Sequence, residues 1–370
     1  MAEEGLLRVI DLDGTYDSKL EPKLTADLLR QAYRHLVLVR LLDTRMLSLQ
    51  RQGRIGFYVP STGEEAAQVG SGMALEKRDW VFPAYREPGC ALWRGFPVET
   101  LIAQAYGNSK DPQQGRQMPN HYGARDIHYV TPSSPVGTQI PQAVGAAWAA
   151  KIRKDDIVSL TYFGDGATSE GDFHAGMNFG GVFKTPTIFF CKNNQWAISV
   201  PVSRQTASKT LAQKAAAYGV EGIRVDGNDL LAVYAATKVA VDKARAGGGP
   251  TLIEAFTYRI GPHSSSDDPT RYRTKEEVDF WVQRDPIERF RKYLELKRLW
   301  SKEYDDRLRA EIEDLLQATI KEVERHPPPS IETLFSDVYA EMTPQLREQM
   351  EAYLASGERR RPELLDKFPL

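Results

Sequence analysis

The sequence predicts an α/β fold in which helices cover both faces of a parallel sheet, followed by a helical C-terminal extension. Three observations lead to this fold class. Unbroken apolar runs such as "DIVSLTYF" and "TPTIFFC" are typical of strands buried on both faces. Helical patterns alternate with these runs, as in a parallel sheet with crossover helices. After Gly261 the strand pattern stops and only helices are expected.

The N-terminal part of the chain is expected to be mainly helical. Residues 1–24 read as a loose N-terminal arm. Apolar positions recur at helical spacing over residues 25–52, and Gly53 follows as a stop signal. A second helix is expected near residues 64–76. The stretch "RDWVFPAYREPG" then reads as a short strand and turn, "PVETLIAQAYG" as a helix and "GRQMPNHYGARD" as a loop.

The middle of the chain alternates helices and strands. The stretch "SSPVGTQIPQAVGAAWAAKI" predicts a helix rich in small residues, which we expect to be buried between other elements. Strand "DIVSLTYF", a helix in "SEGDFHAGMNFGGVF" with Ser169 as candidate N-cap, and strand "TPTIFFCKNN" follow. The pattern continues with a helix near residues 207–218, strand "GIRVDG", a helix over residues 229–246 and strand "TLIEAFTYRI".

These elements divide the chain into one domain and an extension. We expect a single α/β domain over residues 25–285 and a helical C-terminal extension over residues 286–370 that packs on it. Helices are predicted from residue 274 to about residue 325, where "HPPPS" interrupts them. A last helix is predicted from about residue 344 to residue 359.

The composition argues against several classes of protein. The 370 residues include 48 Lys and Arg and 50 Asp and Glu, so the chain lacks the basic surplus of a nucleic-acid-binding protein. No apolar stretch reaches the length of a membrane span, and the acidic start is unlike a signal or transit peptide. Cys90 and Cys191 form no paired motif, so we expect no disulfide framework or structural zinc site. A cytoplasmic protein is the expectation.

The stretch "YFGDGATSEG" places an acid, Asp165, between two glycines at the end of a predicted strand. It is not a dinucleotide fingerprint, because Ser169 stands where the third glycine of G-x-G-x-x-G belongs. The next strand ends at Asn193 and Asn194, and 194 − 165 = 29 residues is the span of one strand–helix–strand crossover. Ligands bind outside the carboxyl ends of parallel strands, so Asp165 and Asn194 are expected to meet there.

A carboxylate and an amide oxygen at this place suit a hard divalent cation that keeps other oxygen ligands. Gly-Asp-Gly followed at this span by Asn-Asn matches the motif that binds thiamin diphosphate with Mg²⁺, and phosphate oxygens would supply the missing ligands. The alternative is a turn between a strand and a helix, with an Asn-rich loop and no ligand.

Further stretches of the chain resemble one family. From about Leu28 to about Met350 the chain is similar to the alpha subunit of the decarboxylating component of 2-oxo acid dehydrogenase complexes. The resemblance rests on "FPAYREPG", "GRQMPNHYG", "SSPVGTQIPQAVGAA", "GDGATSEGDFHAGMNF", "NNQWAIS", "RVDGNDLLAVY" and "YRIGPHSSSDDPTRYR", in this order. It implies the thiamin-diphosphate-binding fold, a beta subunit in an α2β2 heterotetramer, and a lipoyl domain of a dihydrolipoyl acyltransferase core as partner.

The resemblance also implies roles for single residues. Asp165, Asn194 and the backbone carbonyl of Trp196 would hold Mg²⁺, and His263 would assist acyl transfer to lipoamide. The other implied cofactor contacts are Tyr85, Arg86, Ser134, Val136, Gly164, Gly166, Ala167 and Lys192. In some members of the family a K⁺ ion is bound at the positions of Ser133, Pro135, Thr138 and Gln139.

Two of these positions depart from common family patterns. Trp196 stands where a Tyr or Phe is usual, and a backbone ligand survives that change. Lys192 stands where some relatives have Arg, which puts a bidentate phosphate contact there in doubt.

Several candidates also have a simpler structural explanation. His263 lies among serines and aspartates and could be one more solvated loop residue. His121 and His128 could belong to the site or merely pack in their loops. Glu64 and Glu65 could act as a general-base pair, but acids in the first turn of a helix are the commoner explanation.

The resemblance implies half of an enzyme. The chain contains one predicted α/β unit, so a partner would supply the pyrimidine half of the cofactor site and its glutamate. The stretches "GPHSSSDDPTRYR" and "LFSDVYAEMTPQLREQ" favour branched-chain 2-oxo acids as substrate, whereas "PVSRQTASKTLAQKAAAYG" is also similar to pyruvate enzymes. Acetoin dehydrogenase, a transketolase-type enzyme and a non-catalytic scaffold subunit are the alternatives.

Overall fold

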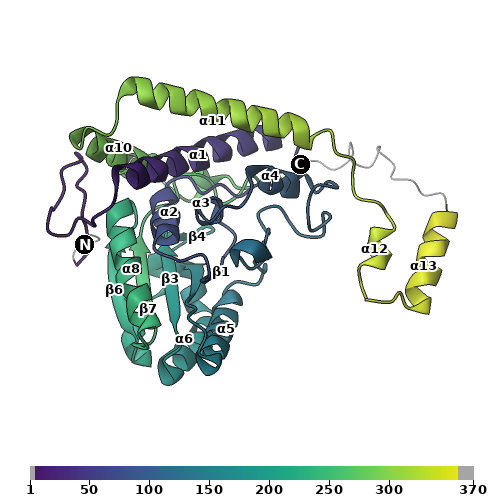
Figure 1. Cartoon of the computed structure of the whole chain (residues 1–370), viewed down its shortest axis with the longest axis horizontal. Helices are drawn as coiled ribbons and strands as arrows, with labels where there is room; N and C mark the ends of the chain where they lie inside the picture. The colour runs from purple at the N-terminus through teal and green to yellow at the C-terminus, as the bar shows by residue number, and fades with distance from the viewer. Residues whose placement is uncertain (1–4, 357–370) are drawn as a thin grey trace.

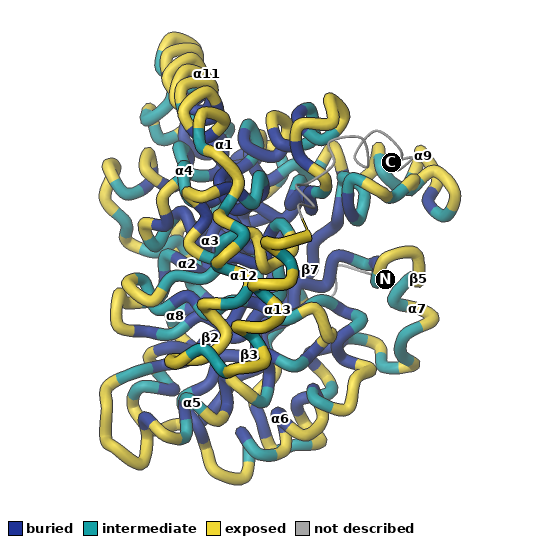
Figure 2. Tube along the Cα trace, turned by 90° about the vertical axis from the view of Figure 1, so that its right-hand side faces the viewer, coloured by how far each residue is buried: buried dark blue, intermediate teal, exposed yellow. Residues whose placement is uncertain are grey.

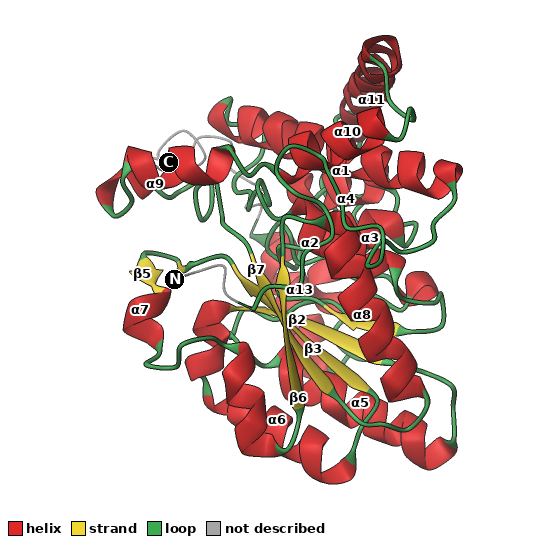
Figure 3. Ribbon diagram, turned by 90° about the vertical axis from the view of Figure 1, so that its left-hand side faces the viewer, coloured by secondary structure: helices red, strands yellow, loops and turns green. Residues whose placement is uncertain are grey.

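The computed structural model describes residues 5–356 of the chain. At its centre lies a five-stranded sheet in the order β1-β2-β3-β7-β6, with every neighbouring pair parallel (Figure 3). The strands are β1 (Trp80–Phe82), β2 (Ser159–Gly164), β3 (Thr187–Asn193), β6 (Glu221–Asp226) and β7 (Thr251–Phe256). The predicted parallel sheet is confirmed.

Apolar side chains fill both faces of this sheet. In β2, Leu160 and Tyr162 belong to one buried cluster and Phe163 to another, because successive strand residues point to opposite faces. The first face is covered by α2 (Glu65–Met73) and α8 (Leu230–Arg245). The second is covered by α5 (Gln139–Arg153), α6 (Gly171–Phe183) and the 3₁₀ helix η3 (Ala212–Tyr218). Unbroken apolar strands are therefore explained by burial on both sides.

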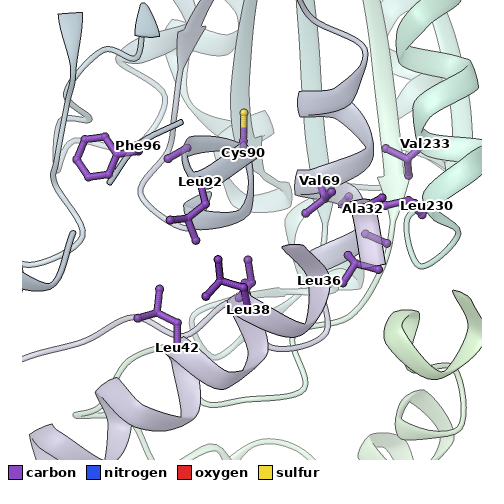
Figure 4. Packing of buried hydrophobic residues seen from close by; sticks show 14 of the residues in the cluster. Ala32, Leu36, Leu38, Leu42, Val69, Cys90, Leu92, Phe96, Leu230 and Val233 are labelled. Carbon is purple, nitrogen blue, oxygen red and sulfur yellow. The ribbon is translucent and has the colours of Figure 1, made fainter. Parts of the chain in front are cut away.

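A layer of helices lies beyond α2. It contains α1 (Ala26–Arg51), α3 (Pro88–Trp93), α4 (Val98–Tyr106), α10 (Pro286–Leu296) and α11 (Lys302–Val323). Thr25 caps α1 by accepting a hydrogen bond from the amide of Leu28. Leucines of α1 such as Leu38 pack toward Val69 of α2 and Leu92 of α3 (Figure 4). The long helix α11 runs along α1 (Figure 1).

The N-terminal arm is packed, where the sequence suggested a loose segment. Leu7 forms a parallel bridge with Val225 beside the edge strand β6. Val9 and Ile10 are buried, and their amides donate to the carboxylate of Asp229 at 2.6 and 2.7 Å. Asp229 also caps α8. Apolar burial and a shared buried carboxylate fix this segment to the domain.

The sequence suggested that the helix rich in small residues is buried between other elements. In the structure one of its sides is exposed. Ala143, Val144 and Ala147 of α5 face the core, whereas Ala149 and Ile152 lie on its exposed side, with Ile152 64% exposed. Within the described chain, α5 contacts the sheet and α6 on one side only. The prediction of burial between elements is wrong for this chain taken alone.

Two local predictions in the second half of the sheet are also wrong. A 3₁₀ turn, η2 (Asp165–Ser169), follows β2 before α6 begins, so Ser169 is not the N-cap. The Ser169 hydroxyl donates instead to Gln205. The helix expected near residues 207–218 is replaced by a short α7 (Val202–Gln205) and by η3. Before α7, β4 (Trp196–Ala197) and β5 (Val200–Pro201) form a small antiparallel ribbon.

The C-terminal helices divide into a packed part and a projecting part. A 3₁₀ turn, η1 (Arg125–Ile127), lies between α4 and α5, and another, η4 (Pro269–Arg271), precedes the C-terminal helices. Of these helices, α9 (Lys275–Val282), α10 and α11 lie on the body of the domain. From Glu324 to the last described residue no side chain is buried. This arm contains α12 (Thr333–Ser336) and α13 (Pro344–Ala355), reaches away from the domain (Figure 1) and is mostly exposed (Figure 2).

The predicted end of the last helix, near residue 359, lies outside the described residues, as does the remainder of the predicted extension to residue 370. Among the helices that the structure describes, none combines the length and apolar character needed to cross a membrane.

Candidate cofactor and metal site

A cavity of about 460 Å³ lies at the carboxyl ends of the strands. Arg86 follows β1, Asp165 follows β2, Asn194 follows β3 and Arg259 follows β7, and all four side chains line it. Gly164 pairs with Lys192 in the β2–β3 register, so these two strands end at the same level. Parallel strands thus bring residues that are distant in sequence to one place.

The predicted cofactor contacts converge on this cavity. Its wall includes Tyr85, Arg86, Ser134, Val136, Gly164, Asp165, Gly166, Ala167, Lys192, Asn194, Trp196 and His263. Of the predicted K⁺ residues, Ser133, Pro135 and Gln139 line it and Thr138 does not. A Cβ atom on Gly166 would lie 2.7 Å from the Cβ of Ala197, so glycine lets the β4–β5 ribbon close over the strand ends.

The two ends of the cavity differ in burial. Asp165 is 1% exposed, Arg86 3% and Asn194 7%, so the inner end is enclosed by protein. At the outer end, Ser134 is exposed and Val136 is 53% exposed. The cavity is therefore closed where the carboxylate lies and open along the loop that contains Ser134.

The inner end has the character of a cation site. The Oδ2 atom of Asp165 is buried and has no hydrogen-bond partner among the described residues. Burial raises the pKa of this carboxyl to about 7, and a cation beside it would hold it in the ionised form. The amide oxygen of Asn194 and the backbone carbonyl of Trp196, which accepts a 2.9 Å hydrogen bond from Arg259, add neutral oxygen donors.

One carboxylate, one amide and one carbonyl fit a hard cation such as Mg²⁺. In the part of the chain that the structure describes, no three His, Cys, Asp or Glu side chains come together to form a metal site. A cation at Asp165 would therefore need further oxygen ligands from a bound molecule, as the phosphate groups of the predicted cofactor would provide.

Lys192 is held by protein groups at the floor of the cavity. Its ammonium nitrogen lies 2.9 Å from a carboxylate oxygen of Glu64 and 2.6 Å from one of Glu87, and donates to the carbonyl of Arg86 at 2.9 Å. Burial disfavours the ammonium, but the two carboxylates outweigh it and raise the pKa of Lys192. In the structure the contacts of this ammonium are thus with neighbouring carboxylates and a backbone carbonyl.

Charge around Glu64 is balanced in the same way. Burial opposes ionisation of this carboxyl, yet Lys192 and Arg86 together lower the pKa of Glu64 below its ordinary value. Glu87 accepts hydrogen bonds from the amides of Ala84 and Tyr85. The floor of the cavity is therefore a buried network of ion-pair contacts and hydrogen bonds.

His263 reaches the cavity from the loop that follows β7. Its ring Nδ1 lies 3.3 Å from Nη2 of Arg86. Because a guanidinium can only donate, Nδ1 is the acceptor, and the proton of the neutral ring is on Nε2. Burial and the adjacent Arg86 lower the pKa of His263 to about 3, so the ring is neutral at physiological pH.

Comparison with known proteins agrees with this geometry. Residues 33–332 match the family model described as "Dehydrogenase E1 component". The chain belongs to the dehydrogenase E1 component family. The earlier resemblance to alpha subunits of 2-oxo acid dehydrogenase complexes is thereby confirmed, and the thiamin-diphosphate-binding fold is the fold of this family.

Individual E1 relatives match almost the whole chain. The "2-oxoisovalerate dehydrogenase subunit alpha, mitochondrial" of Mus musculus is 46% identical, covering 94% of this chain and 79% of its own. The protein of the same name from Homo sapiens is 47% identical, with 94% and 78% coverage. The "3-methyl-2-oxobutanoate dehydrogenase subunit alpha" of Mycobacterium tuberculosis (strain CDC 1551 / Oshkosh) is 44% identical, with 95% and 97% coverage.

The structure separates two histidines that sequence patterns left open. In this E1 chain, His121 lines the cavity, where its ring stacks against Tyr85 and its Nε2 lies 3.2 Å from the Ser134 hydroxyl. His128 lies outside the cavity wall and stacks on Trp80. His121 therefore lies in the cavity wall, whereas His128 packs in its loop.

Sequence patterns gave no role to two residues of the E1 site. Glu87 and Arg259 both line the cavity and are fully buried. Glu87 lies in "YREPG" and Arg259 in "YRIGPH", two stretches that carried the family resemblance. Their position next to predicted site residues was the only sequence feature that could have indicated them. No spacing rule connects them to Asp165, because their contacts form only after the strands are aligned.

Proposed function

We propose that this chain is the alpha subunit of a branched-chain 2-oxo acid dehydrogenase that uses thiamin diphosphate and Mg²⁺. The observation that carries the proposal is the buried Oδ2 atom of Asp165, which has no hydrogen-bond partner among the described residues and lies at the enclosed end of a cavity that stays open at Ser134. The names of relatives such as the mouse and mycobacterial proteins support the substrate class.

The enclosed end would hold the metal and the diphosphate. Asp165, the amide oxygen of Asn194 and the carbonyl of Trp196 would be the protein ligands of Mg²⁺. Tyr85 and Arg86 would face the phosphate oxygens, and the backbone at residues 164–167 would lie along them. When bound, thiamin diphosphate would supply a nucleophilic ring carbanion to add to the 2-oxo acid and a positively charged ring to accept the electron pair released on loss of carbon dioxide.

The open end would receive the aminopyrimidine, bracketed by Ser134 and Val136. The loop of Ser133, Pro135, Thr138 and Gln139 would hold a K⁺ ion. Two residues support this loop site: the buried hydroxyl of Ser133 has no hydrogen-bond partner among the described residues, and the amide nitrogen of Gln139 donates to the carbonyl of Tyr162, so that its oxygen can face a cation.

His263 would serve the transfer of the acyl group to a lipoyl disulfide. Its ring is neutral with the proton on Nε2, so it can donate that proton to the sulfur that leaves when the other sulfur is acylated. Arg86 would set this tautomer by occupying Nδ1. Lys192 would act from the floor of the cavity by neutralising Glu64 and Glu87.

An alpha subunit of an E1 component has a beta subunit as partner. We infer an α2β2 heterotetramer that docks a lipoyl domain of a dihydrolipoyl acyltransferase core. Two features support the partner: the exposed loop at Ser134, and the projecting arm, in which Leu334, Val338 and Tyr339 are each more than half exposed. A cytoplasmic location is part of the proposal, supported by two buried free cysteines, Cys90 and Cys191.

The test is reconstitution with a beta subunit from the same organism. Oxidative decarboxylation of 3-methyl-2-oxobutanoate and of pyruvate, and oxidative cleavage of acetoin, would be compared with an artificial electron acceptor and with a lipoylated domain. We expect activity only with both subunits, thiamin diphosphate and Mg²⁺, and the highest kcat/KM with the branched-chain substrate. Preference for pyruvate or acetoin would overturn the proposed substrate class. Turnover by this chain alone would overturn the proposal that a partner supplies the other half of the cofactor site.

A further inference from the structure

Two consecutive buried acids at the start of α2 have different partners. Glu64 and Glu65 are both 0% exposed. Glu65 pairs with Arg40 at 2.5 Å and accepts from the amide of Gly63, away from the cavity. Glu64 lines the cavity and contacts Asn194. Adjacent helical residues do not share a face, so only Glu64 points to the strand ends.

Glu64 determines which end of the Asn194 amide faces the site. Its Oε1 accepts a 2.8 Å hydrogen bond from the amide nitrogen of Asn194. A carboxylate can only accept, so the NH₂ group of Asn194 must lie on Glu64 and the carbonyl oxygen must lie on the other side. There the backbone amide of Trp196 donates to it at 3.3 Å. The opposite orientation would place two oxygens in contact and direct an NH₂ group at a cation.

Other groups hold Glu64 itself in place. Its second oxygen lies 2.9 Å from the Lys192 ammonium, and Nε of Arg86 lies 3.8 Å from Oε1. These two bases and the acids Glu64 and Glu87 are each no more than 3% exposed. These four buried side chains contact one another as ion pairs and support the carboxylate that orients Asn194.

We propose that Glu64 is a positioning residue that fixes the Asn194 carbonyl oxygen toward a divalent cation bound at Asp165. The proposal rests on the proposed function, because it requires that Asp165 and Asn194 hold Mg²⁺. Glu64 is not itself a ligand in this arrangement, since its Oε1 accepts from Asn194 and its Oε2 lies 2.9 Å from the Lys192 ammonium.

The experiment compares Glu64→Gln with the matched control Glu65→Gln in the assembled enzyme. Calorimetric titration with Mg²⁺ at a fixed, saturating concentration of thiamin diphosphate gives the affinity, and a melting curve checks folding. We expect Glu64→Gln to weaken Mg²⁺ binding by about tenfold or more, the usual cost of losing a partner of a metal ligand. Glu65→Gln should leave Mg²⁺ affinity unchanged. Wild-type affinity in Glu64→Gln would overturn the proposal.

A double-mutant cycle separates orientation from other effects. In an Asn194→Asp background either oxygen of residue 194 can face the cation, and Glu64→Gln removes a carboxylate that would lie against the other oxygen, so Glu64→Gln should cause no further loss of Mg²⁺ affinity there. An equal loss in both backgrounds would mean that Glu64 acts by charge or packing, and would also overturn the proposal. If Glu64→Gln does not assemble, Glu64→Asp, which retracts the carboxylate, should show a partial loss, and an unchanged affinity there would be a contrary result.

Failure of the proposed function would look different. In that case the wild-type enzyme would bind neither Mg²⁺ nor thiamin diphosphate in the same titration. If the wild-type enzyme binds both ligands and Glu64→Gln leaves the Mg²⁺ affinity unchanged, only the positioning role of Glu64 is rejected.

Discussion

Arg86 holds His263 at two points: its Nη2 donates to the backbone carbonyl of His263 at 2.9 Å and lies 3.3 Å from the ring Nδ1. The same guanidinium donates from Nη1 to the carbonyl of Pro60. One buried side chain therefore connects the enclosed end of the cavity, proposed to hold the diphosphate, with the histidine proposed for acyl transfer. A change at Arg86 should affect both cofactor binding and the second half of the reaction.

Arg86→Lys should reduce acyl transfer to a lipoyl domain more than decarboxylation with an artificial acceptor. Lysine keeps the charge but lacks the planar fork that contacts Pro60 and His263 together. A lost charge-assisted hydrogen bond corresponds to about a tenfold or larger loss of rate. Both rates are measured at saturating thiamin diphosphate. Arg94→Lys is the control, since Arg94 also donates to backbone carbonyls but lies outside the cavity wall.

Asp165→Ala should abolish binding of Mg²⁺ and thiamin diphosphate without lowering the stability of the cofactor-free protein. Its Oδ2 has no hydrogen-bond partner in the described structure, so removing this buried carboxylate relieves desolvation. In melting curves of the assembled enzyme, the variant should lose the rise in Tm that the ligands cause. Asp229→Ala, which removes an acceptor of four backbone amides, should lower Tm instead. Wild-type affinity in calorimetry would contradict the role of Asp165.

The loop of residues 261–273 should be ordered more strongly when Mg²⁺ and thiamin diphosphate are bound. Its described contacts are mostly polar: Asp267 accepts from the amide of His263 at 2.7 Å and from the Tyr272 hydroxyl at 2.6 Å. Polar loops with few buried apolar groups open readily, and new contacts near His263 would oppose that. Trypsin should cleave after the exposed Arg271 more slowly in the presence of the ligands.

Cleavage after Arg325, exposed at the end of α11, is the internal control for trypsin activity in that experiment. Its rate should not depend on the ligands, because Arg325 is outside the cavity wall. Equal rates after Arg271 with and without ligands would reject the coupling, while His263 could still act in catalysis.

His263 should stay neutral in the assembled cofactor-free enzyme well below its ordinary pKa of 6.5. Burial and then Arg86 lower its pKa to about 3. Below pH 6.5 the unfolded chain binds a proton here and the folded chain does not, so this residue reduces stability as the pH falls from 6.5 toward 3. Histidine ¹³Cε1 NMR, with the signal assigned through His263→Asn, would follow the ring. A titration midpoint near 6.5 would contradict the prediction.

The strands and the convergence of Asp165 with Asn194 could be predicted because they depend on local patterns and one general rule. Apolar runs give the strands, and parallel strands bring their carboxyl ends together. Features that depend on distant contacts could not be predicted. The packed N-terminal arm depends on Asp229, about 220 positions away from Val9. The 3₁₀ turn at Asp165–Ser169 depends on how the ribbon after β3 closes over β2.

The role of Glu64 shows the same limit within the site. First-turn acids are common in helices, so the sequence alone gave no reason to separate Glu64 from Glu65. The distinction appears only when Asn194, 130 positions later in the chain, comes within 2.8 Å. Lys192 illustrates the converse: the family resemblance implied a cofactor contact at this position, but the ammonium contacts the buried carboxylates of Glu64 and Glu87.

The projecting arm has a consequence for how the protein is made. After synthesis, Leu334, Val338, Tyr339 and Leu354 remain exposed in the described chain until another surface covers them. Exposed apolar groups on an unpaired subunit promote aggregation and recognition by chaperones and proteases. We therefore expect the yield of active enzyme in a cell to depend on the ratio in which the two chains are translated, with any surplus of this chain degraded or precipitated.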